Sequence, residues 1–186
     1  MKRIFLIGFG LVCLLSCDKS KIANTIENKD YAKIRDNASS DDNASELKLS
    51  EYLINNGFDK NGDKVLQDRE LAQIESLKVV GENITNLDVL DKMTNLKQAD
   101  FSDNKIADAI ISAPLLRELN LSNNRLISLD ISKSPKLIDN INLTGNPKLT
   151  CVKVNSRQRT DIMNKAKNLK VDTDKHGKSK VNFNCK

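Results

Sequence analysis

Oxygen-bearing side chains recur at alternate positions of one short segment, with the spacing that a calcium ion requires. With Asp59 as position 1, Asn61 and Asp63 occupy positions 3 and 5, and Val65 at position 7 can supply a backbone carbonyl. Glu70 at position 12 can bind through both carboxylate oxygens. Calcium prefers about six to eight oxygen ligands, and this is the ligand spacing of an EF-hand loop. We therefore expect Asp59, Asn61, Asp63, Val65 and Glu70 to form a calcium site.

One residue of this loop departs from the usual pattern. Lys64 stands at position 6, where glycine is common because the chain turns there with positive φ. A second, similar stretch at 172–177 has His176 at position 5 and no acid at position 12, so we reject it as a partner loop. We expect a single weak calcium site with a structural role. The alternative is a helix–turn–helix that keeps its shape without metal.

The flanks of the loop predict the helices that would position it. Residues 45–54 read as an amphipathic entering helix, and 68–77 begin a second helix with Leu71, Ile74 and Leu77 at helical spacing. Together they predict a helix–loop–helix cap over residues 45–76.

A phased repeat follows this cap. Its clearest copy places Leu116, Leu119, Leu121 and Leu126 around Asn124, in the pattern LxxLxLxxNxL. The corresponding asparagines are Asn104, Asn124 and Asn146, so the period is 20 to 22 residues, which is typical of leucine-rich repeats. The sequence predicts an α+β solenoid of about four repeats over residues 77–150. The first repeat is degenerate, with Glu82 where the asparagine belongs.

Each repeat should contribute one short strand whose leucines face the core. The residues that alternate with the leucines then face outward on the concave side. A repeat stack offers this side to a partner, so we predict a ligand-binding surface there. Its members are polar residues of three successive repeats: Gln98, Asp100, Ser102, Glu118, Asn120, Ser122, Asn140, Asn142 and Thr144.

The N-terminal segment has the features of an export signal. A basic start precedes a short apolar run that ends in Leu14-Leu15-Ser16-Cys17, which resembles the lipobox of bacterial lipoproteins. The resemblance implies a signal peptide at 1–16 and lipidation of Cys17. Residues 17–44 are polar and predict a flexible tether. The alternative is an ordinary secretory signal that contains a cysteine.

The C-terminal segment, 151–186, should close the other end of the stack. It predicts a strand at 151–154, a helix near 156–169 and a last strand at 181–185. In an exported chain, Cys151 and Cys185 are most simply joined by a disulfide, and two buried free thiols are the alternative. This segment is strongly basic, but the chain lacks an aromatic platform for bases, so we do not expect nucleic-acid binding.

The layout as a whole resembles the small secreted or surface leucine-rich-repeat proteins of Bacteroidetes, flavobacteria in particular. The lipobox, the loop 58–70, the repeats, the stretch 146–154 and the terminal Cys185 carry the resemblance. It implies a repeat fold and an export route, and it names no ligand.

These observations favour a membrane-anchored binding module for a protein or a glycan, non-catalytic and monomeric. We expect it in the cell envelope, lipid-anchored to the outer membrane on its surface or periplasmic side. A structural lipoprotein without a dedicated ligand is the second hypothesis. An envelope enzyme is the third and weakest, because His176 is the only histidine and no nucleophile or metalloprotease motif occurs.

Overall fold

A computed structural model describes residues 47–183, all within one compact unit, Asn43–Lys186. The predicted signal peptide at 1–16, the lipidation site at Cys17, the whole tether at 17–44, the first two residues of the helical cap, and Cys185 lie outside the described residues. Within the described part, no helix has the length and apolar character needed to cross a membrane.

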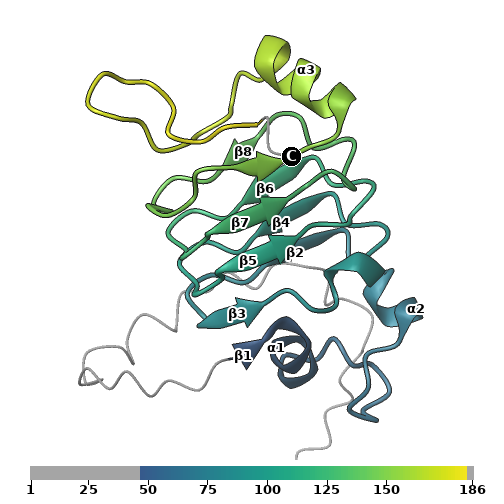
Figure 1. Cartoon of the computed structure of the whole chain (residues 1–186). Coiled ribbons are helices and arrows are strands. Elements are labelled where there is room, and N and C mark those ends of the chain that lie inside the picture. The colour runs from purple at the N-terminus through teal and green to yellow at the C-terminus, as the bar shows by residue number, and fades with distance from the viewer. Residues whose placement is uncertain (1–46, 184–186) are drawn as a thin grey trace, which may run out of the picture. The chain divides into compact units, whose positions relative to one another are not determined.

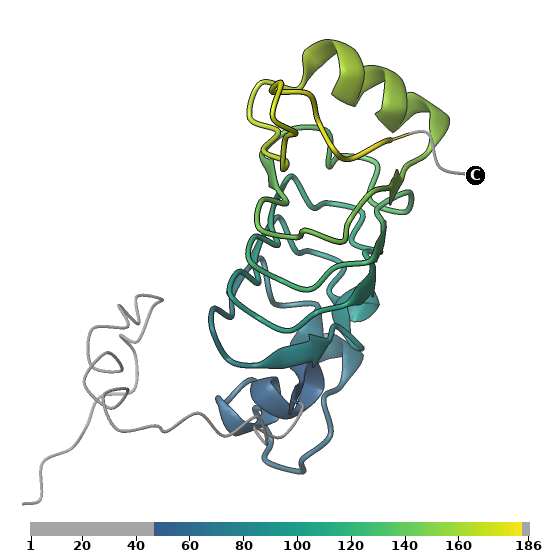
Figure 2. The ribbon, with the colours of Figure 1, turned by 60° about the vertical axis from the view of Figure 1, so that its left-hand side comes forward.

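The repeats form a parallel β-solenoid with two sheets (Figures 1 and 2). The first sheet has the strand order β2-β4-β6-β8, and the second has the order β5-β7-β9. Every pair within these sheets is parallel and in register, so Gln98 lies opposite Glu118 and Asp108 lies opposite Ser128. The bounds are β2 (Ser76–Lys78), β4 (Gln98–Asp100), β5 (Asp108–Ile110), β6 (Glu118–Asn120), β7 (Ser128–Asp130), β8 (Ile141–Asn142) and β9 (Val152–Lys153). The predicted stack of about four repeats is confirmed.

The core lies between the two sheets and consists of the repeated leucine-type positions. Leu116, Leu121 and Leu126 of one repeat are fully buried, and so are Phe101 and Ile106 of the preceding repeat. Because each repeat buries its apolar side chains only against its neighbours, the stack needs a cap at both ends.

The consensus asparagines tie each repeat to the one before it. Asn124 is buried; its Oδ1 accepts a hydrogen bond from the Ile106 amide at 3.0 Å, and its Nδ2 donates to the Phe101 carbonyl at 2.9 Å. Asn104 and Asn146 make equivalent bonds to the repeats before them. These side chains satisfy backbone groups that the turns leave unpaired in the interior.

The N-terminal cap differs from the prediction in the length of its helices. Residues Leu47–Lys48 form a short strand, β1, which pairs with β3 (Ile84–Asn86), and helix α1 (Leu49–Asn55) begins only after it. Helix α2 (Asp68–Leu71) has four residues, whereas a helix to residue 77 was expected.

The second helix ends early because β2 pairs with β4, so Leu77 is buried in a strand. Leu71, Ile74 and Leu77 are all buried, but Leu71 lies in α2 and Leu77 in β2, so their helical spacing does not reflect one helix. Between β3 and β4, the chain forms a 3₁₀ turn, η3 (Leu90–Lys92).

The C-terminal cap contains strand β9 and helix α3 (Ser156–Lys165), which is shorter than the predicted helix. Gln158 of this helix is buried and follows β9 of the second sheet, as the buried Ser134 follows β7 and donates to the Ile111 carbonyl. Gln158 Nε2 donates to the carbonyls of Ile131, Ser134 and Leu137. Of the predicted last strand at 181–185, the described residues 181–183 form a single parallel bridge, between Asn182 and Cys151.

Candidate functional site

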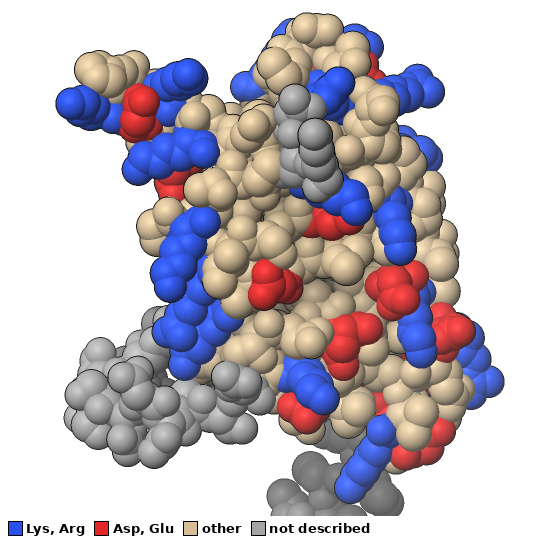
Figure 3. All heavy atoms as spheres, viewed as in Figure 1, with Lys and Arg blue, Asp and Glu red and all other residues tan. Residues whose placement is uncertain are grey.

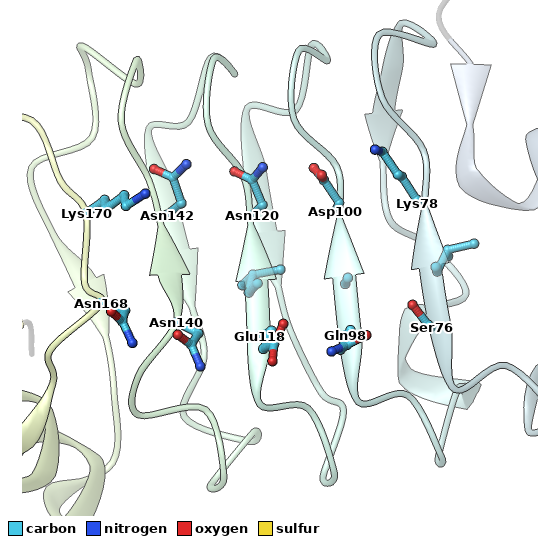
Figure 4. Close-up of a pocket in the computed structure, with 13 residues that line it drawn as sticks. Ser76, Lys78, Gln98, Asp100, Glu118, Asn120, Asn140, Asn142, Asn168 and Lys170 are labelled. Carbon is cyan, nitrogen blue, oxygen red and sulfur yellow. The ribbon is translucent and has the colours of Figure 1, made fainter. Parts of the chain in front are cut away.

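A polar hollow of about 510 Å³ lies along the first sheet (Figure 4). Two rows of outward-facing side chains line it, one at each end of the strands. We call it the concave hollow and define it by ten residues: Ser76, Gln98, Glu118, Asn140 and Asn168 in the first row, and Lys78, Asp100, Asn120, Asn142 and Lys170 in the second row.

The structure brings six of the nine predicted ligand-binding residues together in this hollow: Gln98, Asp100, Glu118, Asn120, Asn140 and Asn142. It does not bring Ser102, Ser122 or Thr144 into it. Ser102 and Ser122 are buried, because the strand ends before them and the alternation of inward and outward residues stops.

These hydroxyl residues instead hold the second row in place. Ser122 donates from its amide to Asn120 Oδ1 at 3.1 Å and from its hydroxyl at 2.8 Å. Ser102 makes the same pair of bonds to Asp100, and Thr144 makes it to Asn142. Each turn therefore fixes one oxygen of the outward-facing side chain.

Asn168 and Lys170 extend the hollow by one rung that was not predicted from the sequence. The Lys170 amide donates to the Ile141 carbonyl and its carbonyl accepts from the Leu143 amide, both at 2.8 Å. Asp139 anchors the segment through the amides of Lys167 and Asn168 at 3.1 and 2.7 Å. The N–H groups of Asn168 and Asn140 lower the pKa of Asp139, so its carboxylate stays charged in mild acid.

Charge is distributed unevenly along the hollow. Lys78 and Lys170 lie at opposite ends, and Asp100 on β4 and Glu118 on β6 lie between them. A smaller neighbouring hollow is lined by Arg117 and by the ion pair of Lys97 with Glu75, which are 2.7 Å apart.

Further cations cluster outside the hollow, on a projecting hairpin (Figure 3). Lys175, Lys178 and Lys180 are exposed there, and Thr173 pairs with Ser179 across the turn. Asp174 closes the turn by accepting bonds from the amides of His176 and Lys178. The hairpin carries three of the ten Lys and Arg residues of segment 151–186, and helix α3 carries three more, so the predicted basic character is spread over the C-terminal cap.

The expected calcium loop folds around its own carboxylates. Asp59 accepts from the amides of Gly62 and Lys64, and Lys64 has a φ of 63°. The positive φ predicted at loop position 6 is therefore confirmed. The Val65 amide donates to Asp63 at 2.8 Å and lowers the pKa of that carboxyl.

The donor set fits calcium in kind, since every predicted ligand offers oxygen. Glu70 is buried, and its two oxygens accept bonds from the amides of Lys60 and Gln67. Asp63 accepts from the side-chain amides of Asn61 and Gln67. Within residues 47–183 no three His, Cys, Asp or Glu side chains are grouped closely enough to hold a metal ion, so binding would require these bonds to rearrange.

Cys151 is disulfide-bonded in the structure. The other cysteines, Cys13, Cys17 and Cys185, lie outside the described residues. The pairing of Cys151 with Cys185 and the lipidation of Cys17 therefore stay predictions.

Comparison with known proteins gives a local similarity. No family model matches the chain. Two curated sequences do: acidic leucine-rich nuclear phosphoprotein 32 family member A from Drosophila melanogaster and from Drosophila pseudoobscura pseudoobscura. Each is 34% identical over 67 residues, which is 34% of this chain and 26% of the relative.

The chain thus spans about a quarter of the length of the curated relatives it matches. Together with the solenoid, the similarity supports leucine-rich repeats as the class of repeat. The resemblance to surface proteins of Bacteroidetes stays a prediction.

Proposed function

We propose that this chain is a non-catalytic leucine-rich-repeat module of the bacterial envelope, which binds a protein or glycan partner through the concave hollow. The observation that carries the proposal is the hollow itself, where ten polar side chains face outward from a regular sheet. Solenoids commonly use such extended faces for binding. The similarity to leucine-rich proteins points to the same class of function.

The rigidity of the hollow supports a binding role. Asp100, Asn120 and Asn142 are held by the turns behind them, so ordering these side chains on binding costs little entropy. The hollow has no aromatic lining residue, and hot spots of protein interfaces favour Trp, Tyr and Arg. We therefore expect modest affinity.

The test is a pulldown with the purified chain against host and bacterial surface material. Glu118→Lys inserts a cation at the centre of the hollow and should abolish capture. Ile110→Thr is the matched control, because Ile110 is 65% exposed on β5, in the other sheet. Equal capture by both variants would contradict the proposal.

The proposed location rests on the lipobox-like segment that ends at Cys17. Lipid attachment at Cys17 would place the module at a membrane. Stable anchoring takes about two acyl chains or equivalent membrane-binding groups, because a single chain binds reversibly. Cys17→Ser should release the chain from the membrane fraction of expressing cells. Surface proteolysis of intact cells then distinguishes an outward-facing binding module from a structural lipoprotein on the periplasmic side.

Calcium has a structural place in this proposal. The residues that would hold it are Asp59, Asn61, Asp63, Val65 and Glu70. Bound there, the cation would neutralise the loop's carboxylates and fix α2 against the first repeat. In the chain, the loop leads into α2, and β2 of the first repeat follows α2.

A further inference from the structure

The orientation of two amide side chains in the concave hollow is fixed by hydrogen bonds. Asn120 Oδ1 accepts from Ser122, and Asn142 Oδ1 accepts from the Thr144 amide at 3.3 Å and hydroxyl at 2.9 Å. A planar amide has an oxygen end and a nitrogen end. Since the oxygen ends are held by the turns, both side chains offer their Nδ2 donors to a ligand.

Lys170 adds a positive charge beside these donors. Its backbone is held by β8, its side chain is exposed, and it points into the hollow next to Asn142 (Figure 4). Among the described residues it forms no ion pair within 4.0 Å. This end of the hollow therefore suits an anion or a carboxylate.

The centre of the hollow has the opposite character. One Asp100 oxygen accepts from Ser102, which leaves the second oxygen for a ligand, and Glu118 is exposed on the next strand. Lys78 lies one strand beyond Asp100. A ligand cation is therefore favoured over the two carboxylates and disfavoured next to Lys78.

The rungs set the distance between these two subsites. Lys170 lies two rungs from Glu118 and three rungs from Asp100, by way of β8. At about 4.8 Å per rung this is about 10–14 Å. An extended peptide covers that distance in three to four residues at about 3.4 Å each.

We propose that the hollow selects an extended peptide segment that carries a basic residue and a carboxylate three or four positions apart. The basic group lies over Asp100 and Glu118, and the carboxylate lies against Lys170 and Asn142. The inference rests on the proposed binding function of this hollow. A peptide fits better than a glycan because it supplies both charges on one extended chain, and no aromatic platform for a sugar lines the hollow.

The test uses fluorescent synthetic peptides and the purified full chain in low salt. Each peptide has one lysine and one aspartate in a Ser/Gly background, in both orders, at separations of one to six positions. Affinity should peak at three or four positions. Lys170→Glu should weaken these peptides about tenfold and strengthen peptides with two lysines at the same separation, whereas Lys170→Gln should only weaken binding.

Several results would overturn the inference. Affinity that does not depend on separation would do so, as would equal losses for all peptides with Lys170→Glu, or binding of uronic-acid oligosaccharides in preference to every peptide. If Glu118→Lys abolishes capture of surface material while the peptides show no optimum, the peptide assignment fails and the binding function stands. If neither probe depends on the hollow, the proposed function fails as well.

Discussion

Replacing a consensus asparagine should lower the free energy of unfolding strongly, because its one side chain satisfies backbone groups of two repeats. Asn124 connects two repeats: Oδ1 accepts from the Ile106 amide at 3.0 Å, and Nδ2 donates to the carbonyls of Phe101, Leu121 and Ser122 at 2.9, 3.2 and 3.2 Å. In Asn124→Ala all four contacts disappear inside the stack.

The loss is dominated by the groups that are left without a partner. The Ile106 amide is buried, and an unsatisfied buried donor costs about 1–3 kcal/mol. The Phe101 carbonyl keeps a weaker bond from Asn104, at 3.1 Å, and loses about 1 kcal/mol. The Leu121 and Ser122 carbonyls keep bonds from Asn146 and from the Asp103 amide. We therefore expect a loss of about 2–4 kcal/mol.

Urea unfolding followed by circular dichroism measures this change, with a matched thermal melt. For a chain of this size, the midpoint should fall by about 2–4 °C for each kcal/mol. Asn123→Gly is the control. The Asn123 side chain is exposed and donates to Asp103 in the neighbouring turn, and the residue has a φ of 55° that glycine adopts freely. The control should change stability by less than about 1 kcal/mol.

Asn124→Asp separates the donor bonds from the acceptor bond. It keeps an oxygen for the Ile106 amide and removes the Nδ2 donors, so a carboxylate faces the carbonyls. It should be at least as unstable as Asn124→Ala at pH 7. The reasoning is refuted if Asn124→Ala costs no more than Asn123→Gly, or if Asn124→Asp matches the unaltered chain.

Three further predictions concern the turns and caps. Gly145→Ala should cost about 1–3 kcal/mol in urea unfolding, because φ is 74° and the added Cβ overlaps the Asn123 oxygen; Asn123→Gly should recover part of this loss, and an absence of coupling would contradict the overlap. The pKa of Asp139 is lowered in the folded chain, so its stabilising effect is complete above the ordinary value of 3.8 and is lost as pH falls through the lower folded value. The melting temperature measured from about pH 2 to 6 should show this acid-dependent loss in the unaltered chain and not in Asp139→Ala. An identical pH profile in both chains would contradict the assignment. With a dissociation constant of about 1 mM, 10 mM Ca²⁺ should stabilise the chain by about 1.4 kcal/mol, and Asp59→Ala should remove the shift; no shift in the unaltered chain would exclude the site.

The repeat stack could be predicted because its signals are local and recur. The spacing of Leu119, Leu121 and Asn124 specifies both the strand and the turn that follows it, and each copy supports the others. The left-handed turn at Lys64 is also predictable, because position 6 of the loop pattern normally requires positive φ.

The parts that could not be predicted depend on partners distant in the chain. Residues Ser76–Lys78 form a strand and not a helix because they pair with β4. Asn168 and Lys170 line the hollow because Asp139 accepts hydrogen bonds from amides 28 and 29 residues away. Neither pairing has a periodic signature. The start of helix α3 at Asn155 could be inferred weakly, because Gln158 stands three residues after it, as in a capping box.

The burial of Ser102 and Ser122 has a different cause. Alternation places both residues outward, but the strand ends at Asp100 and at Asn120, and the following turn directs each hydroxyl back to that side chain. An Asp or Asn two residues before a Ser or Thr at a strand end predicts this arrangement, and Asn142 with Thr144 repeats it.

The central claim is that the concave hollow contacts the partner. A photoreactive amino acid at Asn140, within the hollow, tests this directly against the same group at Ile110, in the other sheet. Irradiation of the full chain with surface material should yield a discrete crosslinked product from position 140 and none from position 110. Crosslinking from position 110 alone, or with equal yield from both positions, would contradict the account.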